Sequence, residues 1–267
     1  MERREVEKVL EAEDVEEKNA GVAAFFDLDG TLMRFPSLEK RFLSMLRYRK
    51  LIGVRNYVLW IAEAVRLVPR GINQVMHANK MHLRGVSVGE KDLLKAQSYY
   101  PEAIERVAWH VERGHLIAIV SGTLEFLAER AARVLEAELG ARGLACTIRI
   151  CSMRLEEEND RWTGRVVGEA MFGEEKARAI RRIAAAEDLD LQRCFAYGDS
   201  ASDKWMLDAV GKPAAVNPSN DLGRIARRND WTILSWGKEK TFMQRASRAE
   251  ESDRELEAVR AKAGFRA

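Results

Sequence analysis

The stretch VAAFFDLDGTL, residues 22–32, decides how this chain is interpreted. Its first five residues are apolar, which is typical of a short strand buried on both faces in a parallel sheet. The run then stops abruptly in Asp27 and Asp29, which are followed by Gly30. Because ligands of open parallel sheets bind outside the carboxyl ends of the strands, the two aspartates mark a place to look for chemistry.

Further short apolar runs follow, with helical patterns between them. Residues 116–120 form one run, which we expect to stop at Ser121-Gly122-Thr123 and to continue as a helix over 124–139. Residues 194–197 form another, which is closed by Gly198-Asp199-Ser200. Additional strands are predicted at 146–153, 213–216 and 231–234. This alternation predicts an α/β fold, with a Rossmann-like three-layer core, a parallel sheet and helices on both faces.

The chain is expected to consist of a core and an inserted unit. Residues 38–100 have a helical pattern with a break at Pro69-Arg70-Gly71, so the predicted core comprises 21–37 and 101–240. A hairpin is predicted within that core at 154–167, with its turn at 157–160. The two ends are predicted as a charged N-terminal helix over 1–20 and a helical or disordered tail over 241–267.

Composition excludes several classes of protein. The 44 Lys and Arg residues nearly balance the 42 Asp and Glu residues, so there is no general basic field and we expect no nucleic-acid partner. The three cysteines include no CxxC pair, which favours a reducing, cytoplasmic setting over a disulfide framework or a zinc site. The best candidate for a membrane span, residues 51–68, is interrupted by charged side chains.

The residues that end the predicted strands share a chemical character. Asp27, Asp29 and Asp199 are carboxylates, Ser121 is a hydroxyl, and Lys176 opens a helix after Gly173. Residues two apart in an extended segment project to the same side, so we expect Asp27 and Asp29 to share a centre with Asp199. A few hard oxygen ligands with room for water and phosphate favour Mg²⁺. The set as a whole is suited to phosphoryl transfer.

Taken in order, these segments resemble the four motifs of the haloacid dehalogenase (HAD) superfamily. The motifs are Phe26-Asp27-Leu28-Asp29-Gly30-Thr31-Leu32, Val120-Ser121-Gly122-Thr123, Gly173-Glu174-Glu175-Lys176 and Tyr197-Gly198-Asp199-Ser200-Ala201-Ser202-Asp203. The helical insert and the hairpin before Lys176 resemble those of subfamily IB, the phosphoserine-phosphatase-like branch, whose insert is an all-helical C1-type cap.

The resemblance implies a Mg²⁺-dependent phosphatase that hydrolyses a phosphate monoester. Asp27 would form an aspartyl-phosphate, and Asp29 would act as general acid and then as general base. Carried over in the same way, the metal ligands are the Asp27 carboxylate, the Asp29 main-chain carbonyl and Asp199, with Asp203 supporting them. Ser121, Gly122 and Lys176 would bind the phosphate.

The substrate stays open at this point. Phosphoserine phosphatases of this type carry a glutamate shortly after the first motif to recognise the substrate ammonium, and this chain has Met33-Arg34-Phe35-Pro36-Ser37 there. The candidates are a small phosphorylated metabolite, such as an amino-alcohol phosphate, and a lipid phosphate. Alternative functions are phosphoryl transfer to an acceptor other than water and a non-catalytic HAD-fold binding protein.

The insert has a charge of its own. Residues 38–100 contain twelve Lys or Arg against four acidic residues, which would draw an anionic phosphate ester towards the site. The same segment includes an apolar, aromatic stretch over 54–68 flanked by basic residues, which suits either a peripheral contact with an anionic membrane or a helix with a solvated basic exterior. His77 and His82, five residues apart, are expected to be packing or surface residues rather than metal ligands.

Overall fold

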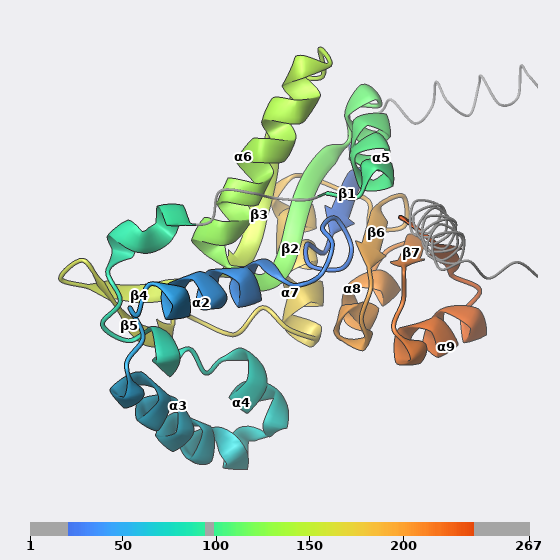
Figure 1. Cartoon of the computed structure of the whole chain (residues 1–267). Coiled ribbons are helices and arrows are strands. Elements are labelled where there is room, and N and C mark those ends of the chain that lie inside the picture. Colours follow the sequence, from blue (N-terminus) through green and yellow to red (C-terminus); the bar gives the residue numbers. More distant parts are fainter. Residues whose placement is uncertain (1–20, 94–98, 238–267) are drawn as a thin grey trace, which may run out of the picture.

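The computed structural model describes residues 21–93 and 99–237. The predicted N-terminal helix over 1–20, the predicted tail over 241–267 and residues 94–98 of the insert lie outside these residues. Within them the chain forms a six-stranded parallel sheet with helices on both faces, so the predicted α/β fold is confirmed (Figure 1). The order of strands across the sheet is β3-β2-β1-β6-β7-β8.

All strands predicted from apolar runs are present. The six strands of the main sheet are β1 (Ala23–Phe26), β2 (Leu116–Leu124), β3 (Ile148–Met153), β6 (Phe195–Gly198), β7 (Lys212–Val216) and β8 (Thr232–Leu234). Strand β1 lies between β2 and β6, in the centre of the sheet. Its four residues alternate between two cores: Ala24 and Phe26 belong to one, Ala23 and Phe25 to the other. This explains why the run is apolar throughout.

Two groups of helices cover the two faces of the sheet. One core is closed by α2 (Leu38–Tyr48), α5 (Pro101–Glu112) and α6 (Glu125–Ala141), and the other by α7 (Glu174–Ala186), α8 (Lys204–Asp208) and α9 (Asn220–Arg228). Local sequence sets several of their starts. Pro101 occupies the first turn of α5, where no backbone N–H is needed. Ser219 caps α9 by accepting the N–H of Leu222 at 3.3 Å.

The insert is helical, as predicted, as far as it is described. It contains α2, α3 (Val54–Leu67) and α4 (Ile72–His77), with short 3₁₀ segments η1 (Val68–Arg70), η2 (Met81–Leu83) and η3 (Val88–Leu93). The predicted break at 69–71 is present, and Gly71 has a φ of 101°, a conformation that favours glycine. A further 3₁₀ turn, η4 (Ala201–Asp203), follows β6 in the core.

The predicted hairpin forms, but its partners are in the insert. Strands β4 (Leu155–Glu158) and β5 (Arg161–Val166) pair antiparallel. The N–H of Val88 donates to the carbonyl of Asp160 at 2.9 Å, and the N–H of Trp162 donates to that of Val86 at 3.0 Å. The indole of Trp162, 1% exposed, packs against Phe42 of α2. The hairpin, which the sequence assigned to the core, is therefore bonded to the inserted segment.

One predicted boundary is wrong. Strand β2 does not stop at Ser121 but runs to Leu124, which pairs with Met153 of β3. The register shifts between Val120 and Leu124, and within this irregular stretch the Ser121 hydroxyl accepts the N–H of Thr123 at 3.3 Å. The polar residues that mimic a strand end are thus part of a β-bulge.

None of the helices in the described part of the chain combines the length and the apolar character that crossing a membrane requires.

Candidate active site

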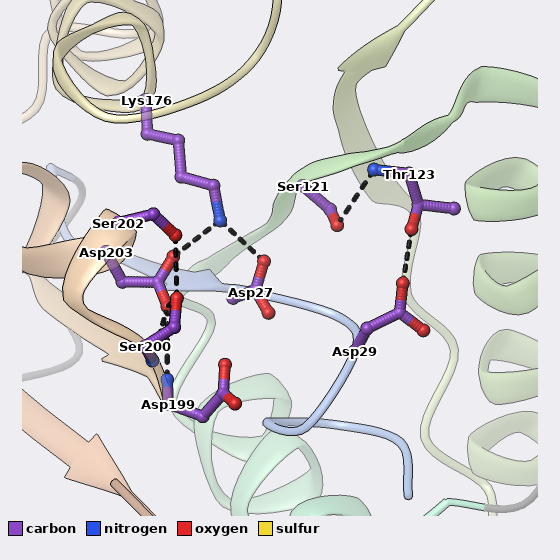
Figure 2. A network of polar contacts seen from close by, with 9 residues as sticks. All are labelled: Asp27, Asp29, Ser121, Thr123, Lys176, Asp199, Ser200, Ser202 and Asp203. Carbon is purple, nitrogen blue, oxygen red and sulfur yellow. Dashed lines mark hydrogen bonds and ion pairs between the residues drawn. The ribbon is translucent and has the colours of Figure 1, made fainter. Parts of the chain in front are cut away.

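The carboxyl ends of the three central strands bring the predicted site residues together. Asp27 follows β1 directly, Asp199 follows β6, and Ser121 lies in the irregular end of β2. The N–H of Asp27 donates to the carbonyl of Tyr197 at 2.9 Å, which ties the loop after β1 to the end of β6. Lys176 enters from the first turn of α7 (Figure 2).

Lys176 joins two of the aspartates. Its Nζ lies 2.5 Å from Oδ1 of Asp27 and 2.6 Å from Oδ1 of Asp203. All three side chains are buried. Burial alone would lower the pKa of Lys176, but the two carboxylates hold it above its ordinary value. The lysine is therefore a fixed positive charge beside Asp27.

Asp27, Asp199 and Asp203 form a compact group of carboxylates. Each offers an oxygen within 4.8 Å of the others. Asp203 also accepts the backbone N–H groups of Asp199 at 3.2 Å and of Ser200 at 2.9 Å, which fixes the loop after β6. Gly30 permits the close approach, because a Cβ there would lie 2.3 Å from Oδ2 of Asp199.

The burial of these carboxylates changes their protonation. Burial first, and then the negative charges of Asp27 and Asp203, raise the pKa of Asp199 from 3.8 to about 8. Burial raises the pKa of Asp27 to about 7 against the opposing effect of Lys176. Without a cation these carboxyl groups therefore tend to hold protons near neutral pH, because Lys176 alone does not neutralise three carboxylates.

Asp29 is oriented differently from the expectation. The strand ends at Phe26, so the alternation of an extended chain does not continue to Asp29, and its carboxylate points away from the other three aspartates, towards Thr123 (Figure 2). The Thr123 hydroxyl donates to Oδ2, and the N–H of Leu38 donates to Oδ1 at 2.8 Å. Burial raises the pKa of Asp29, which makes it easier for this group to hold a proton.

A cavity of about 370 Å³ opens over this group. Asp27, Asp29, Gly122, Lys176 and Asp199 line it, whereas Ser121, which is buried, does not. Its opposite wall comes from the insert. A larger cavity of about 620 Å³ lies around the starts of β6 and β7, and Tyr197 is the one motif residue in its lining, which includes none of the site aspartates and not Lys176.

The insert supplies lining residues that sequence reasoning missed. Glu39 and Lys80 form an ion pair with Nζ 2.5 Å from Oε1, and Lys80 is buried. His77 stacks on Phe172 with ring centroids 3.8 Å apart, and burial lowers the pKa of His82 to about 4. No motif marks these residues, because they meet the core only through the folding of the insert.

The match to known families covers most of the chain. Residues 24–208 match the family described as haloacid dehalogenase-like hydrolase. The chain belongs to this family. The predicted resemblance is thereby confirmed. Each of the four motifs contributes residues to the lining of one cavity of this HAD hydrolase, the one over Asp27.

The HAD hydrolase is similar in sequence and in fold to proteins named as phosphatases. It is 32% identical over 225 residues to a protein named phosphoserine phosphatase SerB1 from Mycobacterium tuberculosis, covering 79% of this chain and 70% of the other. A crystal structure of a Bordetella pertussis Tohama I protein with unknown function is 25% identical and superposes with a TM-score of 0.63, covering 81% of this chain and 99% of the other. An apo phosphoserine phosphatase structure, 19% identical with a TM-score of 0.58, shares the fold over 81% of this chain and 94% of its own. The predicted enzyme class, phosphoric monoester hydrolase, is confirmed.

Proposed function

We propose that this protein is a Mg²⁺-dependent phosphatase that hydrolyses a small phosphate monoester through an aspartyl-phosphate on Asp27. One observation carries the proposal: Asp27 is buried, is held by Lys176 at 2.5 Å, and still lines the cavity. A carboxylate in that position can reach a phosphorus atom bound above it, and the lysine beside it can neutralise a phosphate oxygen.

The three clustered carboxylates, Asp27, Asp199 and Asp203, fit a divalent cation. Three carboxylates with oxygens within 4.8 Å of one another, contacted by one lysine, leave two formal negative charges in a buried place. Hard oxygen donors without histidine or cysteine favour Mg²⁺. Asp27 and Asp199 would hold the ion, together with the main-chain carbonyl of Asp29, and Asp203 would support them. The bound ion would supply charge neutralisation for the phosphate oxygens.

The protein's own residues account for both chemical steps. Asp27 attacks phosphorus, and the bond from phosphorus to the ester oxygen breaks while Asp29 delivers a proton to the leaving alkoxide. Asp29 then takes a proton from a water molecule that attacks the phosphorus, which releases inorganic phosphate and restores the Asp27 carboxylate. The donors Thr123 and Leu38 N–H hold Asp29 in one orientation for both transfers.

The insert would select the leaving group, as a cap over the cavity. The relative from M. tuberculosis is named a phosphoserine phosphatase, and a small phosphorylated metabolite fits a space of about 370 Å³. Glu39 is an acidic side chain of the insert's wall, and Lys80 already neutralises it. Neutralising Glu39 therefore does not require an ammonium group on the substrate.

The thiols of Cys146, Cys151 and Cys194 are free, which supports a reducing, cytoplasmic setting.

The test is phosphate release from a generic aryl phosphate by the full chain. We expect turnover with Mg²⁺, none with EDTA, and recovery when excess Mg²⁺ is added back. Asp27→Asn should abolish turnover, whereas Asp208→Asn, at an exposed carboxylate of α8, should keep it. Full activity of Asp27→Asn would refute covalent catalysis by this residue.

A further inference from the structure

Helix α3 of the insert turns an aliphatic face to solvent. The residues of this face, here called the α3 stripe, are Val54, Val58, Ile61 and Val65 of α3 and Val68, which follows directly and begins η1. They recur every three or four residues, so they share one side of the helix. Their exposure ranges from 56% for Ile61 to 79% for Val54. A surface helix ordinarily turns such a face towards a core, and this one does the opposite.

The α3 stripe lies at an extremity of the molecule. Helices α3 and α4 project away from the six-stranded sheet, on the side opposite the free ends of α5 and α6 (Figure 1). Ile72 at the start of α4, the next helix of the insert, is also exposed, at 66%. Contiguous aliphatic surface of this kind marks a place where a soluble protein contacts another body.

Basic groups border the α3 stripe on both sides. Arg55 and Arg66 are eleven residues apart, close to three helical turns, so they flank the same side. The one acidic residue of α3, Glu63, is paired with Arg66 at 2.5 Å. On the other side Arg47 donates to the Tyr57 hydroxyl at 2.8 Å and lies over its ring.

We propose that the α3 stripe is a docking surface for an anionic phospholipid bilayer. Aliphatic side chains would enter the boundary between headgroups and acyl chains, and the guanidinium groups of Arg55 and Arg47 would meet lipid phosphates, whereas Arg66 is held by Glu63. A second copy of the chain fits less well, because a two-fold contact through the α3 stripe would oppose the basic borders of both copies.

This surface is separate from catalysis. None of the five residues of the α3 stripe lines the cavity over Asp27. Docking would therefore place the enzyme at a membrane without altering the chemistry at its site, and a failure of the phosphatase proposal would leave the docking proposal standing.

The experiment is flotation of the full chain with two kinds of vesicle, one of phosphatidylcholine alone and one of equal parts phosphatidylcholine and phosphatidylglycerol. The test variant combines Val58→Ser, Ile61→Ser and Val65→Ser. The matched control combines Val134→Ser, Val167→Ser and Ile233→Ser, which alter aliphatic residues that are 39–42% exposed outside the α3 stripe. Thermal melting, light scattering and aryl phosphatase activity are measured on all three proteins.

We expect the unaltered chain and the control to float with the anionic vesicles only. Binding should weaken as NaCl is raised from about 0.1 M to about 1 M, since the screening length falls from about 10 Å to about 3 Å. The test variant should lose at least about tenfold in partitioning, with unchanged activity and melting temperature. Absence of flotation by the unaltered chain, or equal flotation by the test variant, would overturn the proposal. So would a lower melting temperature or a loss of dimer in the test variant, because the α3 stripe would then be covered by the chain itself or by a second copy.

Discussion

Replacing Asp199 by asparagine is expected to stabilise the metal-free protein while disabling the site. Asp199 is 8% exposed, and burial together with Asp27 and Asp203 raises its pKa from 3.8 to about 8. The folded protein consequently binds this proton more tightly than the unfolded chain does. With that sign, the free energy of unfolding falls as the pH rises from about 4 towards about 8.

The size of the change in the free energy of unfolding follows from the pH interval over which folded Asp199 holds its extra proton. One extra proton bound by the folded state changes the free energy of unfolding by about 1.4 kcal/mol per pH unit. Raising the pH from 5 to 7 in EDTA should therefore cost the unaltered protein up to about 3 kcal/mol through Asp199. The Asp199→Asn variant lacks this loss, and it also removes one of the negative charges beside Asp27.

The assay is urea unfolding at pH 5 and pH 7, with EDTA or with Mg²⁺. In EDTA, the stability of Asp199→Asn relative to the unaltered protein should improve by about 2 to 3 kcal/mol between pH 5 and pH 7. Adding Mg²⁺ should stabilise the unaltered protein and leave the variant unchanged, because a bound ion favours the folded state. The exposed Asp208→Asn change is the control. Equal pH dependence of the two proteins, or equal stabilisation by Mg²⁺, would refute the reasoning.

Two further predictions concern residues outside the motifs. Lys80→Met leaves the Glu39 carboxylate without its partner at 2.5 Å, so this carboxylate can pair with the ammonium of a substrate. The ratio of kcat/KM for phosphoethanolamine to kcat/KM for ethyl phosphate should then rise by about tenfold, as expected for a partly buried charge pair. An unchanged ratio would show that Glu39 does not face the leaving group. His110, fully buried with Nε2 3.0 Å from the Tyr197 hydroxyl, has its pKa lowered from 6.5 to about 2 by burial and by His115. Below pH 6.5 the folded state thus takes up fewer protons than the unfolded chain, so the free energy of unfolding falls as the pH drops. In urea unfolding, His110→Gln should remove about 2 kcal/mol of the stability that the unaltered protein loses between pH 7 and pH 5. An identical loss of stability in both proteins would exclude His110 as its source.

Sequence patterns predicted the sheet because its strands carry their own signal. Strand β1 is apolar on both faces, and its ends are abrupt, so the run Ala23–Phe26 could be located closely. Asp27 and Asp199 follow two of these strands directly, and both belong to the group of three carboxylates. Lys176, expected with them from the start of a helix, bonds to Asp27. Local pattern and tertiary position agree in this part of the chain.

The remaining parts of the site depend on contacts that no local pattern contains. Thr123 reaches Asp29 across 94 residues of sequence, and Lys80 reaches Glu39 across 41. The orientation of Asp29 depends on where β1 ends and on the bulge in β2. Neither the partner of Glu39 nor the bulge leaves a signature in the sequence, because both arise from the packing of the insert and the hairpin.

The charge of the insert shows how far a count of residues can mislead. Twelve basic against four acidic residues suggested a field directed at the phosphate site. In the structure the basic residues that the insert contributes to the cavity lining are Lys40 and Lys80, apart from its two histidines, and Lys80 is paired with Glu39. Arg55 and Arg66 instead flank the exposed face of α3, which does not line that cavity. Attraction of the substrate therefore falls to Lys40, Lys176 and the cation that the carboxylates would hold, while Arg55 and Arg66 lie away from the cavity.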